Sequence, residues 1–167
     1  MKKMILAIVM LGIAVPLAAI AQDADELKDY MRTLLIGPGL QVSVLHLNEK
    51  TLPSFFQPPT IYAMKTRARE GTLVFVQGTT ERELEIDPGQ FRLEQGGKNS
   101  AGKPVNIKNF QKGRVPGGQR IDGLVQFDQR VDLLKPFSIK YGKESAEFKF
   151  TEDQVKAMAP PPAPAQD

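Results

Sequence analysis

Apolar and polar residues alternate along most of this 167-residue chain, and that pattern constrains its fold more than any other feature. The alternation begins at Leu40 and recurs in short segments up to Phe150. A period of two places successive side chains on opposite faces of a strand, so each segment predicts a strand with one face buried. The sequence therefore predicts an all-β chain of about seven or eight short strands.

Glycine- and proline-containing turns separate these segments, and no helical period lies between them. The expected strands cover residues 40–47, 61–66, 73–76, 84–86, 91–94, 121–128, 137–141 and 146–150, and residues 105–110 suggest another short segment. The run at 73–76 is apolar throughout, which predicts a central strand buried on both faces. Parallel sheets need crossover helices, so the spacing favours an antiparallel sandwich, and a barrel is the alternative.

The segment before Leu40 follows a different period. Its apolar residues fall at i, i+3, i+4, i+7 and i+8, namely Leu27, Tyr30, Met31, Leu34 and Leu35. This spacing predicts a short amphipathic helix within residues 22–38 that ends at Gly37-Pro38-Gly39. We expect the helix to pack on its own domain, and a docking helix for a partner is the alternative.

The C-terminal end carries a helix start followed by prolines. Thr151 and Gln154 have the spacing of a capping box, which predicts a short helix from that point. The helix cannot continue past Met158, because Pro160-Pro161-Pro162 and Pro164 follow. We expect residues 152–167 to form this helix and a disordered proline-rich tail.

The N-terminus has the features of an export signal. Lys2 and Lys3 precede an apolar run, and Ala19-Ile20-Ala21 gives the small-x-small pattern of a cleavage site. Cleavage before Gln22 predicts a periplasmic or secreted protein with no membrane span after cleavage. Eighteen residues from Met4 to Ala21 also approach the roughly 17–25 that cross a bilayer, so an uncleaved anchor is the alternative.

The chain contains no cysteine. A lipoprotein anchor would need a cysteine after the cleavage site, so the signal is not of that type. Thiol catalysis, thiolate zinc sites and disulfides are excluded as well, and the core must depend on Phe, Val, Leu and Ile. Removal of residues 1–21 leaves 20 basic and 19 acidic residues. A nearly neutral chain is not expected to bind nucleic acid.

Residues 72–150 contain three linked pieces. They are Leu73-Val74-Phe75-Val76, Phe91-Arg92-Leu93-Glu94-Gln95-Gly96, and Pro116-Gly117-Gly118 leading to Gly123-Leu124-Val125-Gln126-Phe127. In these pieces the chain resembles a family of exported bacterial domains with an immunoglobulin-like fold. The resemblance implies an immunoglobulin-like β-sandwich over residues 39–151 and a binding or accessory role without catalytic residues. The chain departs from the family at Gly78-Thr79-Thr80 and at the longer stretch 103–112.

Few residues offer catalytic chemistry. His46 is the single histidine and lies among apolar residues of an expected strand, which favours a half-buried structural role. No Gly-x-Ser-x-Gly turn is present, and one imidazole does not make a histidine zinc site. Asp122, Asp128 and Asp132 could supply a carboxylate pair for glycan hydrolysis, but alternation places them on a solvated face. We expect no catalytic residue, metal or cofactor.

One basic stretch with an aromatic residue in its middle is the candidate binding surface. It comprises Lys103, Lys108, Phe110, Lys112, Arg114 and Arg120. An anionic lipid or glycan of the envelope could bind there, whereas a solvated loop and edge strand is the simpler interpretation. The loops at 51–60 and 98–118 are the other expected contact surfaces.

The sequence thus predicts an exported, non-enzymatic immunoglobulin-like module that binds another envelope or extracellular protein or a glycan. Two alternatives stay open: a carboxylate-dependent envelope hydrolase, and a structural subunit that assembles through strand edges.

Overall fold

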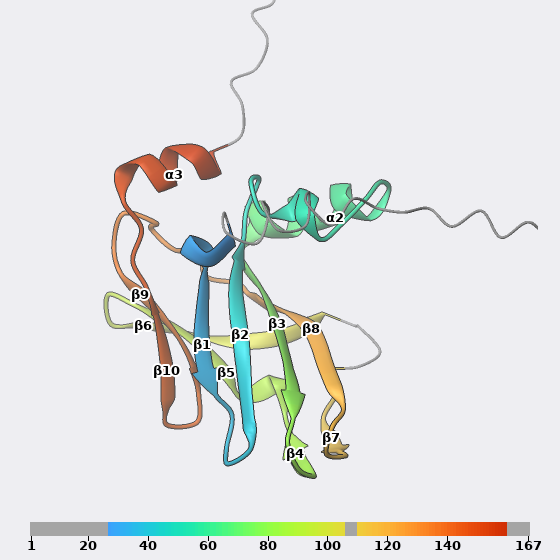
Figure 1. The fold of residues 1–167 in the computed structure, drawn as a ribbon. Coiled ribbons are helices and arrows are strands. Elements are labelled where there is room, and N and C mark those ends of the chain that lie inside the picture. The colour runs from blue at the N-terminus through green and yellow to red at the C-terminus, as the bar shows by residue number, and fades with distance from the viewer. Residues whose placement is uncertain (1–26, 106–109, 160–167) are drawn as a thin grey trace, which may run out of the picture.

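The computed structural model describes residues 27–105 and 110–159, which form an antiparallel β body with two α-helices at one end (Figure 1). The predicted signal segment, its cleavage site at Ala21-Gln22 and the tail at 160–167 lie outside the described residues. In the part that is described, the all-β class and the antiparallel pairing are confirmed.

Eight strands form one continuous hydrogen-bonded sheet, in the order β1-β2-β3-β8-β6-β5-β9-β10. These strands are β1 (Met31–Leu35), β2 (Leu40–Leu47), β3 (Thr72–Thr80), β5 (Phe91–Gln95), β6 (Lys98–Val105), β8 (Arg120–Phe127), β9 (Phe137–Tyr141) and β10 (Glu144–Phe148). Strands β4 (Leu84–Ile86) and β7 (Gly113–Val115) pair separately as a small ribbon.

The sheet curls until its two end strands, β1 and β10, lie side by side (Figure 1). The body is therefore nearly barrel-like, as the alternative prediction had it. Strand β6 makes the bend: residues 98–101 pair with β5, and residues 102–105 pair with β8. Gly102 lies at the bend, where an added Cβ would come within 2.6 Å of Val125 Cγ1. The immunoglobulin-like sandwich stays a prediction.

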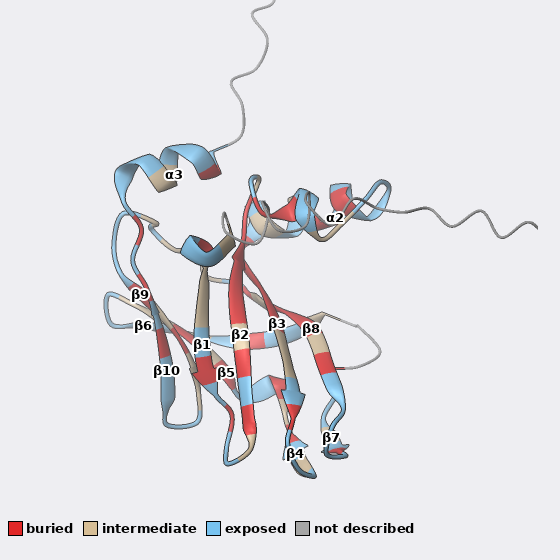
Figure 2. Ribbon diagram, viewed as in Figure 1, coloured by how far each residue is buried: buried red, intermediate tan, exposed pale blue. Residues whose placement is uncertain are grey.

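Inward-facing side chains of all eight strands fill the interior. Phenylalanine contributes the largest fully buried groups, and the rings of Phe137 and Phe148 stack with centroids 5.0 Å apart. Strands β2 and β3 are buried along most of their length (Figure 2). The central strand expected at 73–76 is confirmed, with its four residues buried on both faces.

The prediction of a helix within 22–38 is wrong for residues 27–38, which the structure describes. A 3₁₀ turn η1 (Lys28–Tyr30) leads directly into strand β1. Gly37 and Gly39 adopt positive φ and form a hairpin turn, so β1 pairs with β2 along its full length. Because β1 belongs to the main sheet and Leu34 to the core, the body begins before residue 39.

The strand expected at 61–66 is also wrong. These residues lie in helix α2 (Thr60–Glu70), which packs against β3 and the 3₁₀ turn η2 (Leu52–Ser54). The buried Ile61 and Met64 and the half-buried Ala68 follow a period of 3.6, although alternation would place Ile61 and Met64 on opposite faces of a strand. The rest of the segment is rich in strong helix formers. The sequence of this segment fits both a strand and a helix, and packing against β3 and η2 favours the helix.

Helix α3 (Glu152–Met158) confirms the prediction at the C-terminal end. Thr151 and Gln154 form a capping box, with Gln154 N donating to Thr151 Oγ1 and Thr151 N donating to Gln154 Oε1. The helix ends at Met158, whose side chain packs in the core and is 4% exposed.

Candidate functional site

The structure does not bring the predicted basic surface together. Lys108 lies outside the described residues. Lys103 stands opposite Gln126 near one end of β8, whereas Arg120 is the first residue of that strand. Six residues of extended strand separate these positions by about 20 Å. The described cations therefore occupy different parts of the surface and form no single patch.

Phe110, expected at the centre of that surface, is buried instead. Its side chain is 3% exposed and covers Gly123 of β8, and its ring centroid lies 6.0 Å from that of Phe91. A Cβ at position 123 would come within 2.3 Å of Phe110 Cβ. Phe110 is thus a core residue for which Gly123 leaves space.

The cations of the stretch have polar partners close by. Lys103 Nζ lies 2.6 Å from Asp128 Oδ2, and Lys112 Nζ lies 2.9 Å from Asp87 Oδ2. The hydrogen bond from Lys112 lowers the pKa of the Asp87 carboxyl below its ordinary value. Exposed pairs of this kind contribute little to stability. They match the simpler interpretation, a solvated surface with interspersed charges.

Arg114 and Arg120 complete the predicted set. Arg114 is 3.8 Å from Glu83, and Arg120 Nη2 donates to Gln77 Oε1 at 3.3 Å.

The three candidate carboxylates do not share one cleft. Asp128 pairs with Lys103, and Asp132 pairs with Lys135 at 3.1 Å. The Lys135 hydrogen bond lowers the pKa of Asp132. Asp122 lies opposite Gln77 on β3, six residues before Asp128 in the chain. Asp128 and Asp132 each bind a lysine in place of a second carboxylate.

His46 is more deeply buried than predicted, with 5% of its surface exposed. The rings of Phe137 and Phe150 lie 5.7 and 5.8 Å from the imidazole, and Asn48 Nδ2 is 3.4 Å from Nδ1. Burial lowers the pKa of His46 to about 4. The imidazole is therefore neutral at pH 7, in an aromatic environment that suits a structural role.

A tight turn follows β2 and positions the next charged residue. Asn48 Oδ1 accepts hydrogen bonds from the backbone N–H groups of Lys50 and Thr51, at 2.9 and 3.2 Å. Thr51 Oγ1 in return accepts from Asn48 N at 2.9 Å and donates to His46 O. This reciprocal bonding is the reason Asn and Thr suit a turn. It fixes the backbone on both sides of Glu49.

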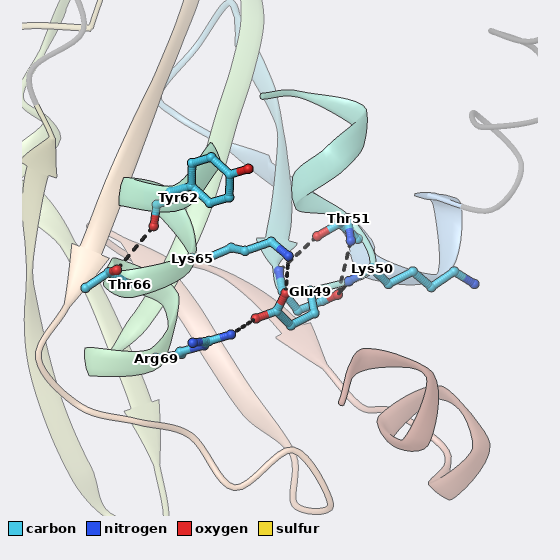
Figure 3. A network of polar contacts seen from close by, with 8 residues as sticks. Glu49, Lys50, Thr51, Tyr62, Lys65, Thr66 and Arg69 are labelled. Atoms are coloured by element: carbon cyan, nitrogen blue, oxygen red, sulfur yellow. Dashed lines mark hydrogen bonds and ion pairs between the residues drawn. The ribbon is translucent and has the colours of Figure 1, made fainter. Parts of the chain in front are cut away.

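Glu49 binds two cations of helix α2 (Figure 3). Its carboxylate oxygens lie 2.7 Å from Lys65 Nζ and 2.7 Å from Arg69 Nη2. Lys65 and Arg69 are four residues apart, so they project from the same face of the helix. Burial raises the pKa of Glu49, but the hydrogen bonds from Lys65 and Arg69 outweigh that effect and lower it overall. The cluster holds α2 against the end of β2.

A cavity of about 390 Å³ lies beside this cluster, and we call it the end cavity. Its walls come from the end of β2, the last turn of α2, the loop at 130–133 and the end of α3. The lining residues are His46, Leu47, Asn48, Glu49, Ala68, Arg69, Gly71, Arg130, Val131, Leu133 and Met158. Apolar walls with a few converging polar groups are typical of ligand sites, and the volume is within their usual range of roughly 300–1,000 Å³.

The loop that contributes Arg130 is held in place by a buried threonine. Thr72 Oγ1 donates to Gln129 O at 2.7 Å and accepts from Val131 N at 3.3 Å. Further along, Gln95 Nε2 donates to Asp132 O at 2.8 Å, and Gln95 Oε1 accepts from Asp132 N at 2.8 Å. The backbone on both sides of Arg130 is therefore preorganised.

Sequence reasoning did not identify the end cavity. Its residues come from four separate elements, and α2 was expected to be a strand. The spacing of Lys65 and Arg69 was the available signal, since it places two cations on one face only if the segment is helical.

The loop at 51–60, expected as a contact surface, forms one wall of a smaller apolar hollow. Phe55 packs on Phe75 of β3 with ring centroids 5.0 Å apart. Leu27, Met31 and Leu45 complete the apolar lining of this hollow, whose volume is about 190 Å³. The end cavity is larger and contains charged groups, so it is the stronger candidate site.

Comparison with known proteins identifies no family for this chain. No family model matches the sequence, and no curated protein matches it. Among solved structures, the chain is similar to a Bacillus subtilis protein described as a "putative lipoprotein", with a TM-score of 0.40 and 16% sequence identity. The match covers 75% of this chain and 41% of that one, so the chain spans less than half the length of its structural neighbour.

The helices in residues 27–105 and 110–159 are all too short or too polar to cross a membrane.

Proposed function

We propose that this protein is an exported, non-enzymatic binding module whose ligand site is the end cavity. One observation carries the proposal: apolar walls and the charged groups of Arg69 and Arg130 converge on a cavity of ligand size. The buried His46 borders the same cavity, and its imidazole contacts Asn48 and two phenylalanine rings, which suits a structural role and therefore binding better than catalysis.

Export is supported by the N-terminal sequence. Lys2 and Lys3, the apolar run and the Ala19-Ile20-Ala21 site have the order of a cleavable signal. We propose that the mature chain begins at Gln22 and acts in the periplasm or outside the cell. Its ligand is then a component of the envelope or its surroundings. The resemblance of residues 72–150 to exported bacterial domains with an immunoglobulin-like fold supports an accessory role, and we include that role and that fold in the proposal.

The test is whether the protein carries a ligand in this cavity. The exported protein is purified from the cells that naturally produce it, and its intact mass is measured by native and by denaturing mass spectrometry. The denatured mass reports whether the chain begins at Gln22. An additional mass that is seen only under native conditions reports a bound ligand.

Two neighbouring leucines supply a matched pair of variants. Leu133 lines the cavity, whereas Leu134 is 61% exposed and does not line it. We expect Leu133→Trp to fill the cavity and abolish the bound mass, and Leu134→Trp to retain it. A ligand that survives Leu133→Trp in a folded protein would place the binding site elsewhere. If no ligand is found under gentle native conditions, the proposed function is overturned.

A further inference from the structure

We infer that the end cavity takes a carboxylate joined to an aliphatic body, with Arg130 binding the carboxylate. This inference rests on the proposed function and specifies the chemistry of the ligand.

The charges at the end cavity favour an anion. Glu49 is the one carboxylate among its lining residues, and it is already bound by both Lys65 and Arg69. Arg130 adds a further positive charge, so the lining holds two cations, Arg69 and Arg130, against the single carboxylate of Glu49, which Lys65 also binds from outside the lining. The C-terminus of α2 also borders the cavity, but Arg67 and Arg69 in its last turn offset the partial negative charge of the helix end.

Arg130 is the group best placed to bind that anion. Among the described residues, no carboxylate lies within ion-pair distance of its side chain. Its backbone is held on both sides by the buried Thr72, whose hydroxyl bonds Gln129 O and Val131 N. A guanidinium presents two parallel N–H donors that match the two oxygens of a carboxylate. A fixed backbone reduces the entropy lost when the ligand binds.

The remaining walls suit an aliphatic body. Leu47, Val131, Leu133 and Met158 line the cavity, and Met158 is nearly fully buried. Methionine and leucine walls adapt to a flexible chain, and burial of each methylene contributes about 0.8 kcal/mol. The lining thus contains both cations and apolar side chains, the two kinds of group that a fatty carboxylate requires.

The probe is decanoate, titrated into the purified exported protein after removal of any bound ligand and monitored by ¹H–¹⁵N NMR. We expect saturable shifts in residues 130–133 and 158. Arg130→Met should weaken decanoate binding about tenfold or more. Arg130→Lys should bind with intermediate affinity. The control is Arg114→Met, because Arg114 is exposed on β7 and does not line the cavity, and it should leave the affinity unchanged.

Two further probes test the ligand chemistry. Decanol has the same body without the charge, and decyltrimethylammonium reverses the charge. Binding of either probe as tightly as decanoate would overturn the inference, and so would an unchanged affinity in a folded Arg130→Met protein. Tighter binding of acetyl-Leu-Leu with a free carboxylate than of decanoate would overturn the aliphatic part. If the purified protein carries a neutral or cationic ligand that Leu133→Trp removes, the proposed function stands and this inference fails.

Discussion

Arg32 on β1 donates a hydrogen bond through Nε to the main-chain oxygen of Glu147 on β10, at 3.0 Å. These strands are the two ends of the eight-strand order, and no backbone ladder joins them among the described residues. The same guanidinium lies 5.5 Å from the ring centroid of Phe148 and donates to Asp29 O and Met31 O. One side chain therefore bridges the seam where the curled sheet closes.

Replacement of Arg32 should weaken this seam. Arg32→Met keeps the apolar stem but removes the charged donors, and we expect the free energy of unfolding to fall by about 1–3 kcal/mol. Urea denaturation measures the change. Arg114→Met is the control, because its exposed 3.8 Å contact with Glu83 should change stability by less than about 0.5 kcal/mol. Equal stability of the two variants would show that the bridge contributes nothing.

Gly123→Ala should destabilise the protein by overpacking. The new methyl group would meet Phe110 Cβ at 2.3 Å, and we expect a loss of about 1–3 kcal/mol. In a Phe110→Ala background the same change should cost less, because the obstructing ring is absent. A double-mutant cycle measured by thermal or urea denaturation gives this coupling. Additive effects would indicate that Phe110 does not cover Gly123 in solution.

The stability of the protein should fall as the pH drops from 6.5 towards 4, because of His46. Its pKa is lowered by burial to about 4, whereas the unfolded chain binds the proton near 6.5. Between these values the unfolded state binds more protons, so acidification favours unfolding by up to about 3 kcal/mol. His46→Leu should lack this component of the pH profile. Because the chain has a single histidine, one imidazole NMR signal checks the pKa directly. Titration of that signal near 6.5 in the folded protein would contradict the prediction.

The Glu49 carboxylate should also stabilise the folded protein, and this contribution should be lost at a lower pH than the one at which the effect of His46 begins. Its pKa lies below the ordinary value of 4.5 because of the Lys65 and Arg69 hydrogen bonds, which outweigh burial. This contribution is fully present above 4.5 and disappears as the pH falls through the folded-state pKa. Glu49→Gln should be less stable than the unsubstituted protein at pH 7 and lose less on further acidification. Urea denaturation at several pH values checks this, with the exposed Glu83→Gln as the control. Parallel profiles for all three proteins would show that the pair is not formed.

Much of the strand pattern could be read from the sequence, because a half-buried strand imposes alternation directly on its residues. The segments at 40–47, 84–86 and 137–141 coincide with β2, β4 and β9. The capping box at Thr151 is equally local, since its donors and acceptors lie three residues apart. These features depend on neighbouring residues, so one-dimensional information is enough to predict them.

Elements stabilised by distant partners were missed or misassigned. Strand β6 reads as a polar stretch, yet it pairs with β5 through one half and with β8 through the other. Strand β1 satisfies a helical spacing, but the hairpin turn at Gly37-Pro38-Gly39 and its pairing with β2 make it extended. In both cases hydrogen bonds to remote strands outweigh local preference.

The antiparallel all-β class, most strand positions and the terminal helix could be predicted from the sequence, because periodicity and capping depend on neighbouring residues. Tertiary structure alone decided that the sheet curls until Arg32 reaches Glu147, that Phe110 is buried over Gly123, and that Glu49, Arg69, Arg130 and Met158 surround one cavity. Those residues are far apart in the chain, and only packing of the whole body brings them within contact distance.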